Sequence, residues 1–301
     1  NRQITHKYLV NFEYQSQLIH FYIKFNHTIV APIKKRETTM KFAAINGISI
    51  HYKLENSGLG KPLIVFSNSL ATDFRIWQDC VDDLSADYSI LRYDKRGHGL
   101  SGMGHPPYEI SDHVNDLVAL MDHLNLSGAL VVGLSVGGLI AQGLYHARPD
   151  LVRGLILCDT AAKIGSAEMW DERINIARQG GMAALVDANM QRWFSPAFHR
   201  DRKTDLNGFI AMFTRTPVEG YIGTGMAIRD ADFRDKACKI SVPTICVVGD
   251  QDGATPPDLV RDTAEMIPGA SFELVKDAGH IPCAEQPAAI VKIIRGMMEA
   301  L

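Results

Sequence analysis

Short apolar segments of the chain alternate with longer segments whose apolar residues recur at helical spacing. Residues 242–249 form one apolar run, as buried parallel strands do. Residues 111–124 instead place apolar side chains on one broad face, which is typical of an amphipathic helix packed on a core. This alternation predicts an α/β fold with a mostly parallel sheet.

The predicted elements begin near residue 40. The Asn46-Gly47 pair, followed by the alternating segment 48–54, indicates a β-hairpin. Further strands are predicted at residues 63–67, 88–93, a run ending at Val132, 152–159, 242–249 and 272–275. Helices are predicted at residues 73–84, 111–124, 256–267 and from Pro287 onward.

Residues 160–230 interrupt this alternation. They contain helical segments separated by glycine-rich breaks and no apolar strand run. An insertion here follows the sixth predicted strand and would lie over the carboxyl edge of the sheet as a helical cap. We expect this cap to carry the substrate specificity, since variable segments on a rigid scaffold usually do.

The first 39 residues differ in composition from the rest of the chain. They hold six Lys/Arg and two acidic residues, whereas the net charge of the whole chain is −3. They have neither a continuous apolar core nor a small-residue cleavage site, so they do not resemble a signal peptide. We predict that residues 1–39 are a disordered or artefactual extension and that residues 40–301 form the catalytic unit. A docked edge strand at residues 22–29 is the alternative.

The strongest chemical signal is Gly133-Leu134-Ser135-Val136-Gly137. It follows an apolar β-branched run and precedes an amphipathic segment. This order of strand, tight turn and helix is typical of a nucleophilic serine held on a strained turn. Glycines on both sides would provide the room that the crowded turn requires. Ser135 is therefore the predicted nucleophile.

A serine hydroxyl needs a base, and the base needs an acid to orient it. His280 follows the last predicted strand, and Asp250 and Asp252 follow the strand at residues 242–249. The carboxyl ends of parallel strands share one edge of the sheet, where Ser135 also emerges. We predict His280 as the base. Asp252 is the preferred acid because Gly-x-x-Asp is the usual spacing in enzymes with a nucleophilic serine on such a turn, and Asp250 is the alternative.

An oxyanion hole needs two backbone N–H groups. Val136, directly after the predicted nucleophile, would supply one of them. The other is expected from Leu70, in the loop after the third strand. Many enzymes with a nucleophilic serine on such a turn carry His-Gly in this loop, where this chain has Asn68 and Ser69. The hydrogen bonding of the loop is therefore left open by the sequence.

Composition narrows the range of functions. The chain of 301 residues is 46% hydrophobic, enough to bury a sizeable core. Its small net charge gives no reason to expect nucleic acid or an anionic membrane as a partner. No apolar run approaches the roughly 20 residues of a membrane span. Five scattered cysteines indicate no disulfide framework, and the histidines show no metal-site spacing. We expect a cytoplasmic protein without a metal.

Residues 40–301 resemble the α/β-hydrolases, and among them the bacterial 3-oxoadipate enol-lactonases. The general motifs are Asp94-x-Arg96-Gly97-x-Gly99-x-Ser101, Gly133-x-Ser135-x-Gly137 and Gly279-His280. The segments that are closer to the enol-lactonases are 66–70, 93–99, 159–170 and 247–255. The resemblance implies an eight-stranded, mostly parallel sheet flanked by helices, with a helical cap after the sixth strand.

The resemblance also implies a reaction. It is the hydrolysis of 3-oxoadipate enol-lactone to 3-oxoadipate in the β-ketoadipate pathway, through an acyl-enzyme and without a cofactor. This substrate carries a carboxylate, for which a guanidinium is a natural partner. Arg173 is the predicted clamp, with Trp170 on the same helix face as an apolar wall. Arg75 and Arg215 are the competing candidates.

Two other classes of function remain open. One is a different hydrolase on this scaffold, namely a carboxylesterase, a carbon–carbon bond hydrolase or a cofactor-free haloperoxidase or perhydrolase. The other is a ligand receptor without enzymatic turnover, as in some plant hormone receptors that resemble small α/β-hydrolases.

Overall fold

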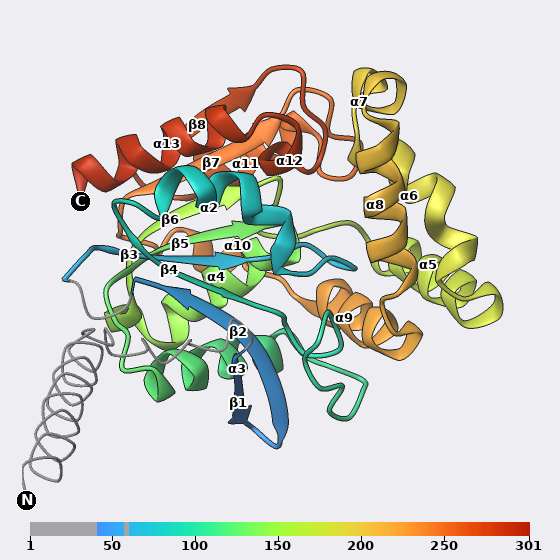
Figure 1. Cartoon of the computed structure of the whole chain (residues 1–301), viewed down its shortest axis with the longest axis horizontal. Coiled ribbons are helices and arrows are strands. Elements are labelled where there is room, and N and C mark those ends of the chain that lie inside the picture. The colour runs from blue at the N-terminus through green and yellow to red at the C-terminus, as the bar shows by residue number, and fades with distance from the viewer. Residues whose placement is uncertain (1–40, 57–59) are drawn as a thin grey trace, which may run out of the picture. The chain divides into compact units, whose positions relative to one another are not determined.

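The computed structural model describes residues 41–56 and 60–301. The sequence-based predictions for residues 1–39 lie outside this part of the chain. Eight strands form one sheet in the order β1-β2-β4-β3-β5-β6-β7-β8 (Figure 1). The strands are β1 Lys41–Ile45, β2 Ile48–Glu55, β3 Leu63–Ser67, β4 Ser89–Tyr93, β5 Ala129–Leu134, β6 Val152–Cys158, β7 Thr244–Gly249 and β8 Ser271–Val275.

The sheet is mostly parallel, as predicted. The β1–β2 and β2–β4 pairs are antiparallel, and the other pairs are parallel. Every residue of β3 and of β5 is buried. Their side chains pack under helices on both faces, which explains why these strands read as continuous apolar runs. The carboxyl ends of β5, β6 and β7 therefore meet at one edge.

Helices cover both faces of the sheet. Figure 1 shows α2 and α13 on one face, with α3 and α4 on the other. The α-helices outside the insertion are α2 Gln78–Leu84, α3 Ile110–His123, α4 Val136–Ala147, α10 Arg234–Ala237, α11 Pro257–Met266, α12 Pro282–Glu285 and α13 Pro287–Ala300. The 3-10 helices are η1 Phe74–Trp77, η2 Pro149–Leu151 and η3 Met182–Leu185.

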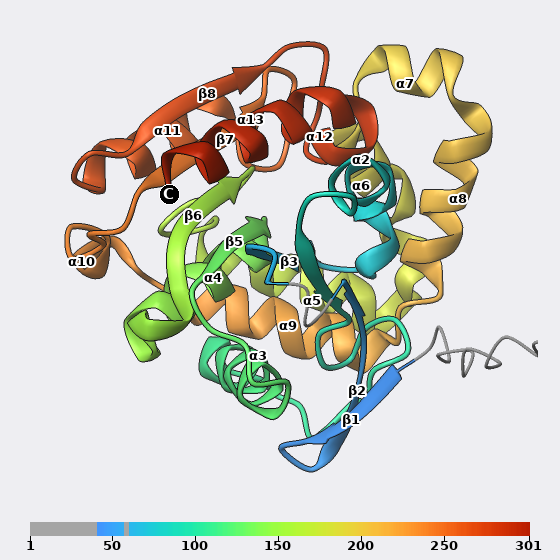
Figure 2. The ribbon, with the colours of Figure 1, turned by 60° about the vertical axis from the view of Figure 1, so that its left-hand side comes forward.

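The segment between β6 and β7 is helical, as predicted. Its five main helices, called the inserted helices below, are α5 Ala167–Gly180, α6 Val186–Trp193, α7 Pro196–Asp201, α8 Lys203–Thr214 and α9 Val218–Asp230. Both views show them grouped together at one side of the sheet (Figure 1 and Figure 2). Within the described ranges, no helix has the length and apolar character needed to cross a membrane.

Candidate active site

Ser135 lies in the tight turn between β5 and α4, as predicted. Its backbone has φ 58° and ψ −118°, a conformation that costs strain in any residue other than glycine. A Cβ on Gly133 would lie 2.3 Å from the carbonyl oxygen of Gly137, and a Cβ on Gly137 would lie 2.1 Å from that of Ser67. The two glycines are therefore what allows strand and helix to meet at this turn. Thr160 supports it by donating a hydrogen bond of 2.7 Å to the Ser135 carbonyl.

The two predicted oxyanion donors lie at the start of α4 and in the loop after β3. Val136 is the first residue of α4, where helix N–H groups have no intrahelical partner. Within residues 41–56 and 60–301, neither the Leu70 N–H nor the Val136 N–H donates to a protein acceptor. Both groups are thus available to a ligand oxygen.

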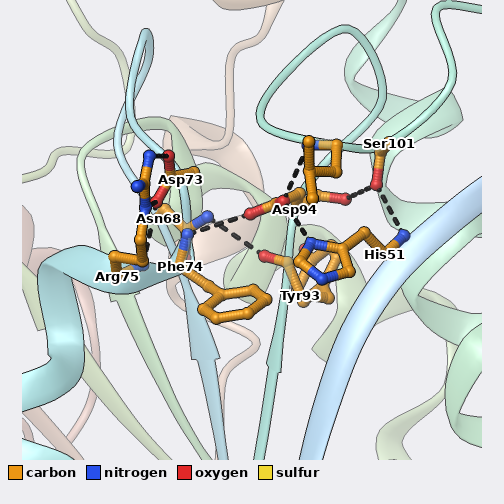
Figure 3. Close-up of polar contacts among 9 residues, drawn as sticks. His51, Asn68, Asp73, Phe74, Arg75, Tyr93, Asp94 and Ser101 are labelled. Carbon is orange, nitrogen blue, oxygen red and sulfur yellow. Dashed lines mark hydrogen bonds and ion pairs between the residues drawn. The ribbon is translucent and has the colours of Figure 1, made fainter. Parts of the chain in front are cut away.

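The loop with Asn68 and Ser69 is held by hydrogen bonds that the sequence left open. The Asn68 amide donates to the Tyr93 carbonyl at 3.0 Å (Figure 3). The Ser69 carbonyl accepts from the Lys95 ammonium at 2.5 Å and from the Thr72 hydroxyl at 2.9 Å. Burial lowers the pKa of Lys95 to about 7. Two side chains therefore anchor the loop to the end of β4 in place of His-Gly. They are Asn68, which lies in the loop, and Lys95, which follows β4.

The structure brings His280 and Asp252 together. His280 Nδ1 lies 2.8 Å from Asp252 Oδ2, and both side chains are buried. The other oxygen of Asp252, Oδ1, accepts from the backbone N–H groups of Ala254 at 2.7 Å and Thr255 at 3.0 Å. Burial acts to raise the pKa of Asp252, but His280 and Thr255 outweigh it and hold the pKa below its usual value. The site thus pairs an ionised carboxylate with an imidazole.

Asp250 has a different environment. It is exposed, and Oδ1 accepts one long hydrogen bond of 3.3 Å from the Ala278 N–H. The turn that separates Asp250 from Asp252 directs only the latter at the imidazole. Of the two candidate acids, Asp252 is the one that the structure places beside His280.

Thr255 and Asp159 are two site residues that the sequence analysis did not single out. The Thr255 hydroxyl donates to Asp252 Oδ2 at 2.7 Å. The Asp-x-x-Thr spacing indicates this contact in the sequence, because a threonine three residues after an aspartate can donate a hydrogen bond to its carboxylate. Asp159 directly follows β6 and is fully buried. The sequence could have indicated Asp159 by its position directly after β6, the strand that lies between β5 and β7.

One grouping of possible metal ligands occurs among the described residues. It consists of Asp159, Asp252 and His280, whose ligand atoms lie within 4.8 Å of one another. His280 Nδ1 and Asp252 Oδ2, however, are already hydrogen-bonded to each other. The grouping therefore coincides with the acid–base pair.

The end of α6 lies directly on this pair. The Trp193 carbonyl accepts from the His280 N–H at 2.8 Å, and the Arg192 carbonyl accepts from the Gly253 N–H at 3.1 Å. The Trp193 ring is stacked near the His280 ring, with centroids 6.5 Å apart. A Cβ on Gly279 would lie 2.4 Å from the Trp193 carbonyl, so this contact needs a glycine. The inserted helices therefore contact the loops that carry Asp252 and His280.

Arg173 and Trp170 lie on one face of α5, as their spacing predicts. The Arg173 guanidinium lies over the Trp170 ring at 4.5 Å. It donates to Asn189 Oδ1 at 2.8 Å and to the Tyr221 hydroxyl at 3.1 Å, which are both neutral groups. Trp170 is only 3% exposed and its indole N–H donates to the Ile164 carbonyl at 2.8 Å. Trp170 thus packs in the interior of the inserted helices and supports Arg173.

Arg75 and Arg215, the two competing candidates, line a pocket of their own between η1 and α8. Arg75 forms a double hydrogen bond with Asp73, at 2.8 and 2.6 Å (Figure 3). Both arginines line a pocket of about 420 Å³ between η1 and α8. Neither Ser135 nor His280 is among the described residues that line it. Arg75 and Arg215 therefore line a pocket whose described lining does not include the predicted nucleophile or base.

Known proteins identify the family. A family model described as the alpha/beta hydrolase family matches residues 64–293. The 3-oxoadipate enol-lactonase 2 of Acinetobacter baylyi is 33% identical over 239 residues, 79% of this chain and 89% of that protein. The 3-oxoadipate enol-lactonase 1 of the same organism is 33% identical over 240 residues, 80% of this chain and 90% of that protein.

A solved structure agrees with these matches. The crystal structure of the enol-lactonase from Burkholderia xenovorans LB400 has a TM-score of 0.83 and 38% sequence identity, covering 86% of this chain and 100% of that one. The resemblance to enol-lactonases and the fold inferred from the sequence are both confirmed. The chain therefore belongs to the alpha/beta hydrolase family and is a hydrolase.

Proposed function

We propose that this hydrolase opens the ring of 3-oxoadipate enol-lactone through a Ser-His-Asp mechanism, with the inserted helices as the cap over the site. Ser135 would attack the lactone carbonyl while His280 accepts its proton. Asp252 holds the imidazole in the required tautomer. The N–H groups of Leu70 and Val136 stabilise the oxyanion.

Collapse of the tetrahedral intermediate breaks the bond between the acyl carbon and the ring oxygen. The enolate formed by ring opening takes the proton from His280 and ends as the ketone, and it remains part of the acyl group that is bound to Ser135. His280 then activates a water molecule that attacks the acyl-enzyme and releases the acid. Every proton transfer in this sequence uses the one imidazole, so no cofactor is required.

The observation that carries the substrate assignment is the environment of Arg173. Its guanidinium is half-buried, bonds neutral partners, and has an Nε without a partner in the described part of the chain. Burial lowers the pKa of Arg192 on α6, and the nearby charge of Arg173 adds to this effect. Two neighbouring guanidinium groups that form no ion pair with a carboxylate in the described part of the chain favour an anionic ligand. A lactone with a side-chain carboxylate meets this requirement.

A row of aromatic rings connects Arg173 with the base. Tyr221, which bonds Arg173, contacts Phe213 with ring centroids 6.1 Å apart. Phe213 contacts Trp193 at 5.4 Å, and Trp193 stacks near His280 at 6.5 Å. This wall would contact the apolar part of a small substrate held between the arginine and the triad.

Rates on two substrates test the proposal. The purified chain should hydrolyse 3-oxoadipate enol-lactone with a kcat/KM at least tenfold above that for p-nitrophenyl acetate, since only the lactone has the carboxylate. Hydrolysis of the ester without the lactone would instead indicate a carboxylesterase. Ligand binding without turnover of either compound would indicate a receptor.

Substitution of Arg173 tests the clamp. Arg173→Met should lower kcat/KM for the enol-lactone by roughly 10- to 100-fold, because a hydrogen bond to a charged group contributes about 1.5–3 kcal/mol. Hydrolysis of the uncharged ester should stay unchanged. Arg178→Met on the exposed face of α5 is the matched control for loss of a positive charge. Equal losses on both substrates would assign Arg173 a structural role.

A further inference from the structure

The Asp159 carboxyl group lies close to the proposed acid–base pair of Asp252 and His280, but it is not part of the hydrogen bond between them. Asp159 is 0% exposed, and Oδ1 accepts a hydrogen bond of 2.9 Å from the Gly249 N–H. Oδ2 has no hydrogen-bond partner among the described residues. A carboxyl oxygen of Asp159 lies within 4.8 Å of ligand atoms of Asp252 and His280. A buried polar atom without a hydrogen-bond partner destabilises the fold, so its presence here needs an explanation.

Two carboxyl groups this close cannot both be ionised in the interior, because like charges repel strongly where water is excluded. The hydrogen bonds indicate which one carries the charge. Asp252 accepts from Ala254, from both donors of Thr255 and from His280. Among the residues that the structure describes, only Gly249 donates to Asp159. Donors stabilise an ionised carboxylate, so the proton belongs on Asp159.

The electrostatic surroundings agree with this assignment. Burial, followed by the charge of Asp252, raises the pKa of Asp159 well above its usual value. Glu285 adds to this effect in the same direction. The nearby thiols of Cys158 and Cys283 are buried, which raises their pKa and leaves them neutral. In the described part of the chain, no Lys or Arg forms an ion pair with either aspartate, and His280 is the only basic group beside them.

We propose that Asp159 is a positioning residue that holds a proton at neutral pH, directs its O–H at Asp252, and so keeps the single negative charge of the pair on Asp252. This inference rests on the proposed Ser-His-Asp mechanism. Asp159 acts through Asp252 and sets the basicity of His280, because a carboxylate that accepts a further hydrogen bond attracts the imidazole proton less strongly.

Asp159→Asn and Asp159→Gly separate the proton from the side chain. The backbone φ of Asp159 is 47°, which Asn and Gly tolerate best. The Asn amide oxygen can accept from Gly249 while its NH₂ group donates to Asp252, as the protonated acid does. Glycine removes both interactions. The readout is the pH dependence of kcat/KM on p-nitrophenyl acetate, which does not involve the carboxylate clamp.

The acid limb of that profile reports the titration of His280. Asp159→Asn should leave its midpoint within about 0.3 pH units of wild type, because no charge changes. Asp159→Gly should raise it by about half a unit or more, because Asp252 loses a donor. A fall of about one unit in Asp159→Asn would show that Asp159 is ionised in the wild type. Identical profiles for all three proteins would assign Asp159 a purely structural role.

Two readouts do not depend on activity, so they keep this inference separate from the proposed function. The infrared spectrum at neutral pH should contain a carbonyl band of a protonated carboxylic acid, present in wild type and in Ser135→Ala but lost in Asp159→Asn. A band that persists in Asp159→Asn would overturn the proposal.

Thermal stability supplies the second readout. An acid whose pKa is raised by folding loses stability as the pH rises above its unfolded value of about 3.9. The Tm of Asp159→Asn should therefore increase relative to wild type by about 3 °C per pH unit above pH 4. A relative Tm that falls with rising pH would show a carboxylate that is ionised in the folded protein.

Discussion

We expect turnover to fall by about 10⁴- to 10⁶-fold when Ser135 is replaced by alanine, because removal of a nucleophile of the proposed Ser-His-Asp triad has that effect. The substitution takes away one hydroxyl and leaves the turn, the oxyanion donors and the His280–Asp252 pair in place. The melting temperature should therefore stay close to that of the wild type. Steady-state kinetics on the enol-lactone and on p-nitrophenyl acetate, with a thermal melt, measure both effects.

Ser241→Ala is the matched control for Ser135→Ala. Ser241 precedes β7, at the opposite end of that strand from Asp252, and its hydroxyl lies 2.9 Å from the Tyr145 hydroxyl. Its loss should leave turnover unchanged. A Ser135→Ala enzyme that keeps a tenth of the wild-type rate on either substrate would exclude Ser135 as the nucleophile.

Asp252→Asn should reduce turnover by about 10⁴-fold on both substrates, because an amide can stabilise the wrong tautomer of His280. The 2.8 Å contact between His280 Nδ1 and Asp252 Oδ2 is the interaction that is altered. The amide is nearly isosteric with the carboxylate, so the loss should appear in kcat and not in the fold. Kinetics over the full pH range, with circular dichroism, distinguish these effects.

The neighbouring aspartate supplies the control for that substitution. Asp250→Asn should change kcat by less than about threefold, because Asp250 is exposed and accepts one weak bond from Ala278. A larger loss in Asp250→Asn than in Asp252→Asn would transfer the role of the acid to Asp250.

Most elements of the fold were predictable because their signals are local. The strand β7 contains the apolar run of residues 245–248, whereas α3 has its apolar residues on one face, so the two patterns differ in period. The predicted start of α3 was one residue late, because Glu109 and Asp112 form a capping box that moves the boundary to Ile110. The turn at Ser135 was predictable for the same reason, since glycines at fixed spacing identify it.

The choice of acid shows where local patterns stop being sufficient. Asp250 and Asp252 stand two residues apart after the same strand, and spacing gave only a preference. The turn after β7 buries Asp252 against His280 and leaves Asp250 exposed. That difference depends on the loop from β8, which brings His280 to within 2.8 Å of Asp252.

Only the tertiary structure shows which residues surround Arg173 and Asp159. The partners of Arg173 are Asn189 on α6 and Tyr221 on α9, which only the packing of the inserted helices brings to α5. Asp159 meets Asp252 because β6 and β7 are neighbours in the sheet. Periodicity and turn residues act over a few positions, so the sequence determines elements and motifs. The order of the strands and the packing of the helices bring distant segments into contact. The tertiary structure therefore decides which charged groups lie close to one another.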